Sequence, residues 1–407
     1  DFEETKFSTK NNFTFEIDKS FKVKNLKLAS KINFNQMIFK NKGYYSEYFP
    51  DLKKKLSLDN HNLELKFEKN ILSINGEGKI QVADSSDKIE YFITKKGDDF
   101  EFETNLNIKE TKIKNQKFFK KNFPKTKDLI DLKNHNLNIK FKDKKLYVSG
   151  EGNIRLQKDF DNIQYLLIKN EDEYQFETDL NLNKLSLKNQ EILKINFPLT
   201  TDLIDLKDHK LNLKYLDKKL YLNGEGGIRF ENDFDNIKYS LIKYNDKTNF
   251  TSEIDLKKIR LKNKENLKKF FPSTKDLLDL KNHKVKINYK DSFFSFSGRG
   301  QIKIDKELNS IDYFISREAS ELNFDINIDL KNTDFKIENI NYKKNNNLTT
   351  NLSISGSLLA KEKFFFNNIS ILDKNNKIKI KNLFVDKNNL LIQLDEADFD
   401  YIDFENK

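Results

Sequence analysis

Residues 137–148 read Leu-Asn-Ile-Lys-Phe-Lys-Asp-Lys-Lys-Leu-Tyr-Val, and this stretch decides the fold class. Leu137, Ile139 and Phe141 alternate with polar residues, which is typical of a β-strand that buries one of its faces. A polar Lys-Asp-Lys turn at 142–144 interrupts the alternation, which resumes at Leu146. The pattern predicts two antiparallel strands joined by a hairpin turn.

The residues that follow extend this hairpin into a meander. Further alternation predicts strands at 163–169 and 174–187, with a bulge where Leu185 and Leu187 change phase. Residues 188–205 lose the alternation, so we expect a short helix there that Pro198 ends or redirects. The prediction is an all-β fold with short helices, in which a tandem-repeat antiparallel meander forms a long curved sheet or groove.

A strict period of 74 residues runs through most of the chain and indicates duplicated structural units. Its markers are Pro50, Pro124, Pro198 and Pro272, followed each time after eleven residues by His61, His135, His209 and His283. The period predicts four repeats at 50–123, 124–197, 198–271 and 272–345, the last of which degenerates at its end. Residues 1–49 match the second half of a repeat, and residues 346–407 form a C-terminal β meander. We therefore expect the sequence to be a fragment of a longer array.

The composition argues against several classes of function. The 407 residues are 37% hydrophobic and 13% aromatic, which is enough for a sizeable core and too much for a disordered chain. The net charge of +10 comes from interspersed Lys, Arg, Asp and Glu rather than from one basic run, which argues against nucleic-acid binding. Cysteine is absent, so disulfides and thiolate sites are excluded. No apolar run reaches the length of about 18 residues that predicts a transmembrane helix.

Motifs for chemistry are missing as well. Each repeat supplies one histidine and no cysteine, which is too few ligands for zinc, so we expect the histidines to be structural or exposed and no metal to be bound. We find no nucleophile elbow, no His-Glu-x-x-His helix and no special pair of carboxylates. The sequence predicts no catalytic residue, no cofactor and no enzymatic activity.

Pairs of glycines recur in the middle of one predicted strand in each repeat. Because they lie on the apolar face, we interpret them as strand-bending residues, and the alternative, which the first does not exclude, is that they make room for a ligand. The pairs are Gly76 and Gly78, Gly150 and Gly152, Gly224 and Gly226, and Gly298 and Gly300. The run Asp159-Phe-Asp-Asn is interpreted as a turn.

An apolar sheet face must be covered by a second layer, by helices, by curling or by a ligand. One short helix per repeat is too little to cover four strands, so we expect an open trough that binds lipid acyl chains. A chain of about 14 methylenes gains roughly 11 kcal/mol at full burial. The lining residues are expected to face one concave surface, with Tyr147, Glu151 and Arg155 in solvent on the convex side. The expected lining is Leu63, Leu65, Ile74, Ile80, Leu137, Ile139, Phe141, Val148, Ile154, Phe176, Leu180, Leu211, Leu213, Leu222, Ile228, Phe250, Val285, Ile287, Phe296 and Ile302.

The tandem strands and two C-terminal runs carry a resemblance to a known family. The runs are Asn-Asn-Lys-Ile-Lys-Ile-Lys-Asn-Leu at 375–383 and Leu-Ile-Gln-Leu-Asp-Glu-Ala-Asp-Phe-Asp-Tyr-Ile-Asp at 391–403. With the alternating strands they resemble the AsmA-like family of the YhdP and TamB type, whose repeating β-grooves are similar to those of bridge-like lipid-transfer proteins. The helix-proline segment in each repeat departs from that pattern.

The resemblance implies a non-enzymatic protein that moves phospholipids between the inner and outer membranes for outer-membrane biogenesis. It implies a periplasmic body in the cell envelope, an inner-membrane anchor outside this fragment and membranes at the ends of the full-length protein. The alternative is a repetitive surface or adhesin-like structural protein, in which the same strands pack as β-sandwich spacers.

Overall fold

The computed structural model describes residues 2–41, 43, 46–171, 173–359, 363–387 and 390–401, and these residues form strands and short helices. The strands are β1 (Phe2–Ile17), β2 (Val23–Lys40), β3 (Lys55–Glu68), β4 (Ile71–Gln81), β5 (Asp87–Lys96), β6 (Asp99–Lys114), β7 (Leu129–Lys142), β8 (Lys145–Arg155), β9 (Asp161–Asn170), β10 (Glu173–Lys188), β11 (Leu203–Leu216), β12 (Lys219–Arg229), β13 (Asp235–Tyr244), β14 (Lys247–Lys262), β15 (Leu277–Lys290), β16 (Phe293–Lys303), β17 (Leu308–Glu318), β18 (Glu321–Leu330), β19 (Lys336–Ile337), β20 (Tyr342–Lys343), β21 (Thr350–Leu359), β22 (Lys363–Leu372), β23 (Lys377–Val385), β24 (Leu391–Gln393) and β25 (Glu396–Asp400). The helices are α1 (Lys117–Asn122), α2 (Glu191–Asn196) and α3 (Glu265–Phe270), with a 3-10 helix, η1, at Glu338–Ile340. The predicted all-β class is confirmed.

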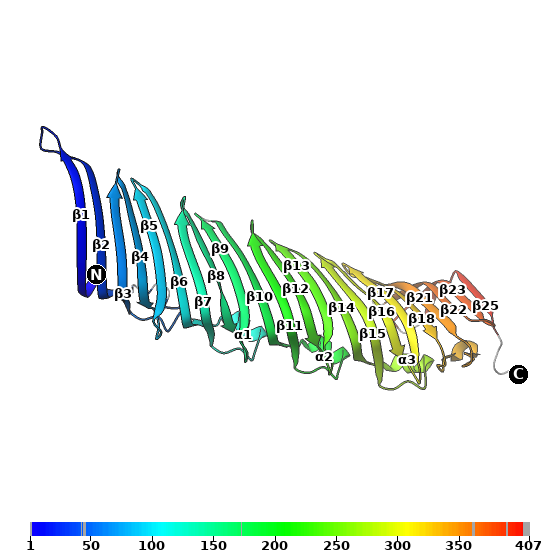
Figure 1. Ribbon diagram of the computed structural model, residues 1–407. Helices are drawn as coiled ribbons and strands as arrows, with labels where there is room; N and C mark the ends of the chain where they lie inside the picture. Colours follow the sequence, from blue (N-terminus) through cyan, green and yellow to red (C-terminus); the bar gives the residue numbers. More distant parts are fainter. Residues whose placement is uncertain are drawn as a thin grey trace. The chain divides into compact units, whose positions relative to one another are not determined.

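Among the described residues, 23 strands belong to one antiparallel sheet, while β19 and β20 form a small sheet of their own. The chain divides into two compact units, Asp1–Ser186 with Asp208–Leu220 and Leu187–Lys207 with Tyr221–Lys407. In the first unit each strand from β1 to β10 pairs with the next along the chain (Figure 1). In the second, β13 to β18 pair in the same way, and β18 continues through β21 and β22 to β23. The predicted meander is confirmed.

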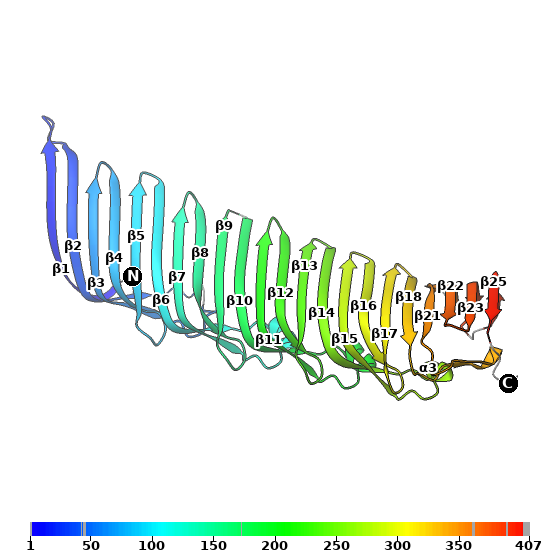
Figure 2. The same ribbon diagram turned by 45° about the vertical axis from the view of Figure 1, so that its right-hand side comes forward.

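The 74-residue period of the sequence recurs in the secondary structure. The strands β3, β7, β11 and β15 begin at Lys55, Leu129, Leu203 and Leu277, and the three α-helices begin at Lys117, Glu191 and Glu265. The strands that follow one another in each unit are joined alternately by tight hairpins at one end and by longer connections at the other (Figure 2). One period after α3 the chain forms η1, although the proline, histidine and glycine markers have disappeared there.

The predicted hairpin turn at 142–144 is confirmed in detail. Lys142 pairs with Lys145, and the two residues between them, Asp143 and Lys144, have φ angles of 51° and 61°. Positive φ at both central positions belongs to the mirror-image turns whose twist matches that of paired strands. The equivalent turn at 217–218 has the same φ values. We call the strand ends joined by these two-residue turns the hairpin end, and the opposite ends the helix end.

The first, second and fourth repeats contain a bulge just before the histidine. Asn134 has a φ of 51°, and the pairing of β7 with β8 shifts between Lys133 and Asn136. Asn60 and Asn282 have φ angles of 49° and 52° at the equivalent positions. Asparagine tolerates this left-handed conformation better than most residues, so its recurrence has a backbone cause.

The second irregularity is the change of phase predicted near Leu185. Leu182 and Leu185 are both buried although they are three residues apart, whereas strict alternation would place them on opposite faces. Between them, the backbone N–H of Asn183 donates to Asp161 Oδ1 over 2.7 Å. The carboxylate of Asp161 thus replaces a strand partner where the ladder is disturbed. The predicted phase change is confirmed, and Asp161 opens β9 rather than lying within a turn.

In the second unit the core lies at the helix end of the strands. Phe271, which follows α3, packs with Phe335 at a ring-centroid distance of 5.0 Å. These rings belong to a buried cluster with Leu278, Ile302 and Leu330. The short helices and the segments after them therefore cover this end of the sheet.

Candidate functional site

The strand register divides the sheet of the first unit into two chemically different faces. Leu106, Leu137, Gly150 and Tyr165 lie opposite one another across β6 to β9. We call the side that carries these residues the apolar face, and the side that carries Asn138 the polar face. The alternation read from the sequence thus corresponds to a real separation of apolar and polar side chains.

The residues predicted to line a groove lie on strand positions of the apolar face. Ile139 pairs with Val148 in the first unit, and Ile287 pairs with Phe296 in the second. The buried members are Ile80, Ile154, Ile228, Val285 and Ile302. The half-buried members are Leu63, Leu65, Ile74, Leu137, Ile139, Phe141, Val148, Phe176, Leu180, Leu211, Leu213, Leu222, Phe250, Ile287 and Phe296.

Burial on the apolar face changes along the strands. In β10, Tyr174 at the hairpin end is 49% exposed, whereas Leu182 and Leu185 toward the helix end are 3% and 4% exposed. In β6, Phe100 at the hairpin end is exposed and Thr111 toward the helix end is buried. The apolar face is therefore covered at its helix end and remains partly open to solvent at its hairpin end.

An apolar hollow lies at the helix end of the second unit. It has a volume of about 520 Å³ and is lined by Leu261, Leu267 and Phe270, together with Lys262 and Lys264. The helix α3 supplies part of its wall, so this hollow lies at the helix end and not at the open hairpin end of the strands.

The recurring glycines make room for aromatic rings of the same sheet. A Cβ atom on Gly150 would lie 2.4 Å from Tyr165 Cζ, and one on Gly152 would lie 2.3 Å from His135 Nδ1. Real Cβ atoms do not approach other atoms so closely, which explains why glycine is required. Rings of the chain itself thus occupy the space beside these glycines, which corrects the alternative that the glycines make room for a ligand. Tyr rings contact Gly76, Gly224 and Gly298, and His rings contact Gly78 and Gly300, while Gly226 holds the equivalent sequence position.

The histidines are structural and buried. His61, His135, His209 and His283 are each at most 2% exposed. Burial lowers the pKa of His61, His135 and His283 below the ordinary value of 6.5, because a charged imidazole is poorly solvated there. These rings therefore lie neutral in the apolar face.

Burial raises the pKa of tyrosines that lie beside the histidines, whereas it lowers the pKa of the histidines. His135 stacks with Tyr165 at a centroid distance of 6.0 Å, and His283 with Tyr313 at 5.9 Å. Burial raises the pKa of Tyr239 and Tyr313 to about 12, because it disfavours the phenolate. The first, second and fourth repeats thus carry a stacked pair of neutral His and Tyr side chains in the apolar face.

Two ionic interactions were missed in the sequence. Arg155, which we expected to face solvent freely, is half-buried and donates from Nε to Asp131 Oδ2 over 2.7 Å. Its guanidinium also lies 4.8 Å from the ring centroid of Phe160. Arg229 and Asp205 form the equivalent ion pair in the next repeat. The separation of 24 residues between Asp and Arg in both repeats was the signal that could have revealed this pair.

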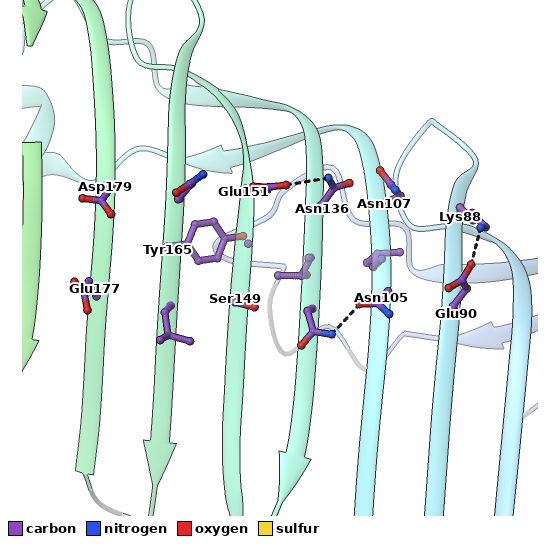
Figure 3. Close-up of a pocket in the computed structure, with 16 residues that line it drawn as sticks. Lys88, Glu90, Asn105, Asn107, Asn136, Ser149, Glu151, Tyr165, Glu177 and Asp179 are labelled. Atoms are coloured by element: carbon purple, nitrogen blue, oxygen red, sulfur yellow. Dashed lines mark hydrogen bonds and ion pairs between the residues drawn. The ribbon is translucent and has the colours of Figure 1, made fainter. Parts of the chain in front are cut away.

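The polar face carries a hollow of about 670 Å³ across β5 to β10 (Figure 3). Its lining includes short side chains that lie opposite one another, with Asn105 facing Asn138 and Asn138 facing Ser149. Asn138 Nδ2 donates to Asn105 Oδ1 over 2.8 Å. A second hollow of about 420 Å³ shares Glu90 and Asn105 with the first. Short amide and hydroxyl side chains create these depressions and offer donors and acceptors to water or small polar molecules.

The carboxylates of the larger hollow are already engaged. Glu90 Oε1 forms an ion pair with Lys88 at 2.5 Å, and Glu177 Oε2 forms one with Lys214 at 3.5 Å. The carboxylate of Asp179 accepts from the amide of a neighbouring asparagine over 2.9 Å. The charges of this hollow are therefore largely balanced by the chain itself.

The position of these hollows corrects one expectation. We expected the apolar face to be the hollowed side and Glu151 to lie on a convex side, but Glu151 lines the larger hollow on the polar face. Leu137, a predicted lining residue of the apolar face, also contributes to it together with Leu106, Gly150 and Tyr165, since these four lie between the polar-face positions along the same strands. The reason is steric, because short side chains such as Asn138 and Ser149 leave space above the polar face.

No cluster of three or more potential metal ligands occurs within the part of the chain that the structure describes. Over the same residues, none of the helices has the length and apolar character needed to span a bilayer. Comparisons with models of known protein families, with curated protein sequences and with solved structures find no match for this chain.

Proposed function

We propose that this protein is a non-enzymatic lipid-binding protein whose apolar face holds phospholipid acyl chains during transfer. The observation that carries the proposal is the half-buried state of large apolar side chains such as Ile139, Val148 and Phe176, which recur strand after strand. Large contiguous apolar patches are uncommon on soluble monomers and mark interaction surfaces. An acyl chain is a partner that matches a long apolar surface without polar contacts.

The energetics favour such a partner. Each methylene moved from water to an apolar lining gains about 0.8 kcal/mol. An open face covers one side of the acyl chain, so about 14 methylenes gain roughly half of the 11 kcal/mol expected at full burial. That is enough to hold a chain reversibly.

Repetition favours movement over storage. Leu137, Ile139 and Val148 recur as equivalent residues in the next repeat, so an acyl chain displaced by one repeat meets nearly the same lining. Neighbouring positions then have similar binding free energies, and no single site traps the lipid. The face is suited to a lipid that slides along it.

In this proposal the chain is part of an AsmA-like bridge in the periplasm, with membranes at the ends of the full-length protein. The tandem antiparallel meander is consistent with that assignment. The β-sandwich spacer is less well supported, since sandwiches need two packed sheets and 23 of the described strands share one.

A pair of adjacent residues tests the proposal. Val148→Asp places a carboxylate on the apolar face, whereas Ser149→Asp places the same group on the polar face of the same strand. Val148 is preferable to Ile154, which lies at the covered helix end where a charge would disturb the core. We expect Val148→Asp to reduce the transfer of fluorescent phosphatidylcholine between vesicles at least tenfold, because an acyl chain that passes a carboxylate must desolvate it.

Ser149→Asp should leave this transfer within twofold of the parent protein. Circular dichroism verifies that both variants are folded. If the folded Val148→Asp protein transfers lipid at the parent rate, or if the parent protein binds no lipid, the proposal is wrong and a spacer role becomes the better account.

A further inference from the structure

On the apolar face, basic side chains lie at the hairpin end of the strands and acidic side chains lie at the helix end. In the first unit Lys169 lies opposite Leu146 on one side and Tyr174 on the other, at the hairpin end of β9. Lys95 lies opposite Phe100 at the hairpin end of β5. Both lysines are exposed, and Lys169 Nζ lies 5.4 Å from the ring centroid of Tyr174. Each cation therefore stands at the open edge of the apolar face.

The second unit repeats this arrangement. Arg317 lies opposite Phe294 and Leu322 at the hairpin end of β17, and Lys243 lies opposite Thr248 at the hairpin end of β13. Arg317 and Lys243 are exposed as well. One basic residue thus occupies this position in each of four repeats, at the 74-residue step. We call Lys95, Lys169, Lys243 and Arg317 the basic edge.

On the apolar face of β5, β9 and β13, the acidic residues lie at the helix end and accept hydrogen bonds. Asp87, Asp161 and Asp235 are buried at the start of β5, β9 and β13. Their carboxylates accept backbone N–H groups over 2.7 to 2.9 Å. In β9 the eight residue steps from the aspartate to the lysine correspond to about 27 Å of extended chain. These three carboxylates are thus too distant to neutralise the basic edge, and the acidic residues beside the hairpin turns, Asp99, Glu173 and Glu318, lie at strand positions of the polar face.

We propose that the basic edge binds the phosphate of anionic phospholipids whose acyl chains lie on the apolar face. This inference rests on the proposed function and names its substrate class. The half-exposed apolar side chains beside each cation would hold the tails, and the exposed ammonium or guanidinium group would reach the headgroup in water. A lipid with net negative charge gains this attraction, whereas the choline of a zwitterionic lipid offsets it. The basic edge therefore selects phosphatidylglycerol over phosphatidylcholine.

The test compares binding of fluorescent phosphatidylglycerol and fluorescent phosphatidylcholine by the full chain. At low salt we expect phosphatidylglycerol to bind about fivefold or more tightly than phosphatidylcholine, with the difference shrinking as sodium chloride is raised. The combined substitution Lys95→Gln, Lys169→Gln, Lys243→Gln and Arg317→Gln should abolish this preference. Binding of phosphatidylcholine should stay within twofold of the parent protein, since the apolar face is unchanged.

A matched control removes the same charge from strand positions of the polar face. Its substitutions are Lys66→Gln, Lys140→Gln, Lys214→Gln and Lys286→Gln, and it should keep the preference for phosphatidylglycerol. Equal binding of the two lipids by the parent protein, or an equal loss of preference in both variants, would overturn the inference while leaving acyl-chain binding intact. Full competition by free glycerol 3-phosphate would also overturn it, because the site would then not need the tails. Failure to bind either lipid would instead refute the proposed function.

Discussion

The imidazole ring of His61 lies almost parallel to the phenyl ring of Phe34, with centroids 5.1 Å apart and an interplanar angle of 6°. The same imidazole stacks with Tyr91 at 5.8 Å. Gly78 makes this arrangement possible, because a Cβ atom there would lie 2.2 Å from the His61 Nδ1 atom. A titratable ring is thereby fixed in an apolar stack, and its protonation must be linked to folding.

Acidification should destabilise the protein. The unfolded chain protonates its histidines below about pH 6.5, whereas burial lowers the pKa of His61, His135 and His283 in the folded chain. The stabilising effect of neutral histidines is complete above pH 6.5 and is lost as the pH falls below that value. The free energy of unfolding should fall by up to about 1.4 kcal/mol per pH unit for each such histidine. Urea titrations at pH 7.5, 6.5 and 5.5 measure this, and a midpoint independent of pH would contradict it.

Gly150→Ala should destabilise the protein by about 1 to 3 kcal/mol, because the new methyl group would overlap the Tyr165 ring. Ser149→Ala, on the other face of the same strand, serves as the control and should change the free energy of unfolding by less than 0.5 kcal/mol or so. In a Tyr165→Leu background the added methyl group should cost clearly less. Urea denaturation of the four variants gives the coupling, and purely additive effects would show that the glycine has another purpose.

Asp161→Asn should be tolerated, whereas Asp161→Ala should cost about 1 to 3 kcal/mol. The reason is that the side-chain oxygen must accept the N–H of Asn183, and Asn309 performs the same task in the fourth repeat by accepting the N–H of Lys331 over 2.8 Å. Burial also raises the pKa of Asp161, so the neutral amide removes an unfavourable charge. Thermal unfolding of both variants measures the loss of stability. A smaller loss in Asp161→Asn than in Asp161→Ala would indicate a hydrogen-bonding role, whereas equal losses would indicate that the charge is required.

Arg155→Ala should cost about 2 to 3 kcal/mol because it leaves the buried carboxylate of Asp131 without its cation. Arg299→Ala breaks a pair with Asp312 in which both side chains are exposed, so its cost should stay below about 1 kcal/mol. Chemical denaturation in low and high salt compares the two variants. Similar losses in both would show that burial does not determine the strength of these pairs.

The sequence predicted the strands, the turn at Asp143 and the phase change at Leu185, because each leaves a local pattern of apolar and polar residues. It did not reveal why glycine recurs at 150 and 152, since the Tyr165 and His135 rings that exclude a side chain come from neighbouring strands. Close approach between strands depends on register, which no single strand encodes.

The basic edge was not predicted from the sequence for a different reason. Lys95 and Lys169 look like solvated lysines in a chain with 74 Lys and Arg residues. Only the pairing with Phe100 and Tyr174 shows that they share the apolar face. The burial of Ile154 at the helix end was not predicted either. It depends on the connecting segments between repeats, whose sequences lack the alternating pattern.

The regular junction between repeats has a consequence for how such a protein changes length. Each of the four prolines follows a phenylalanine, at Phe49, Phe123, Phe197 and Phe271. Excision of residues 124–197 would therefore recreate an unaltered Phe-Pro junction and remove four strands with one helix, so that every remaining residue could keep an equivalent neighbour. Four strands correspond to about 19 Å across a sheet. Unequal recombination between repeats would thus change the number of strands in the sheet four at a time, without altering the junction between repeats.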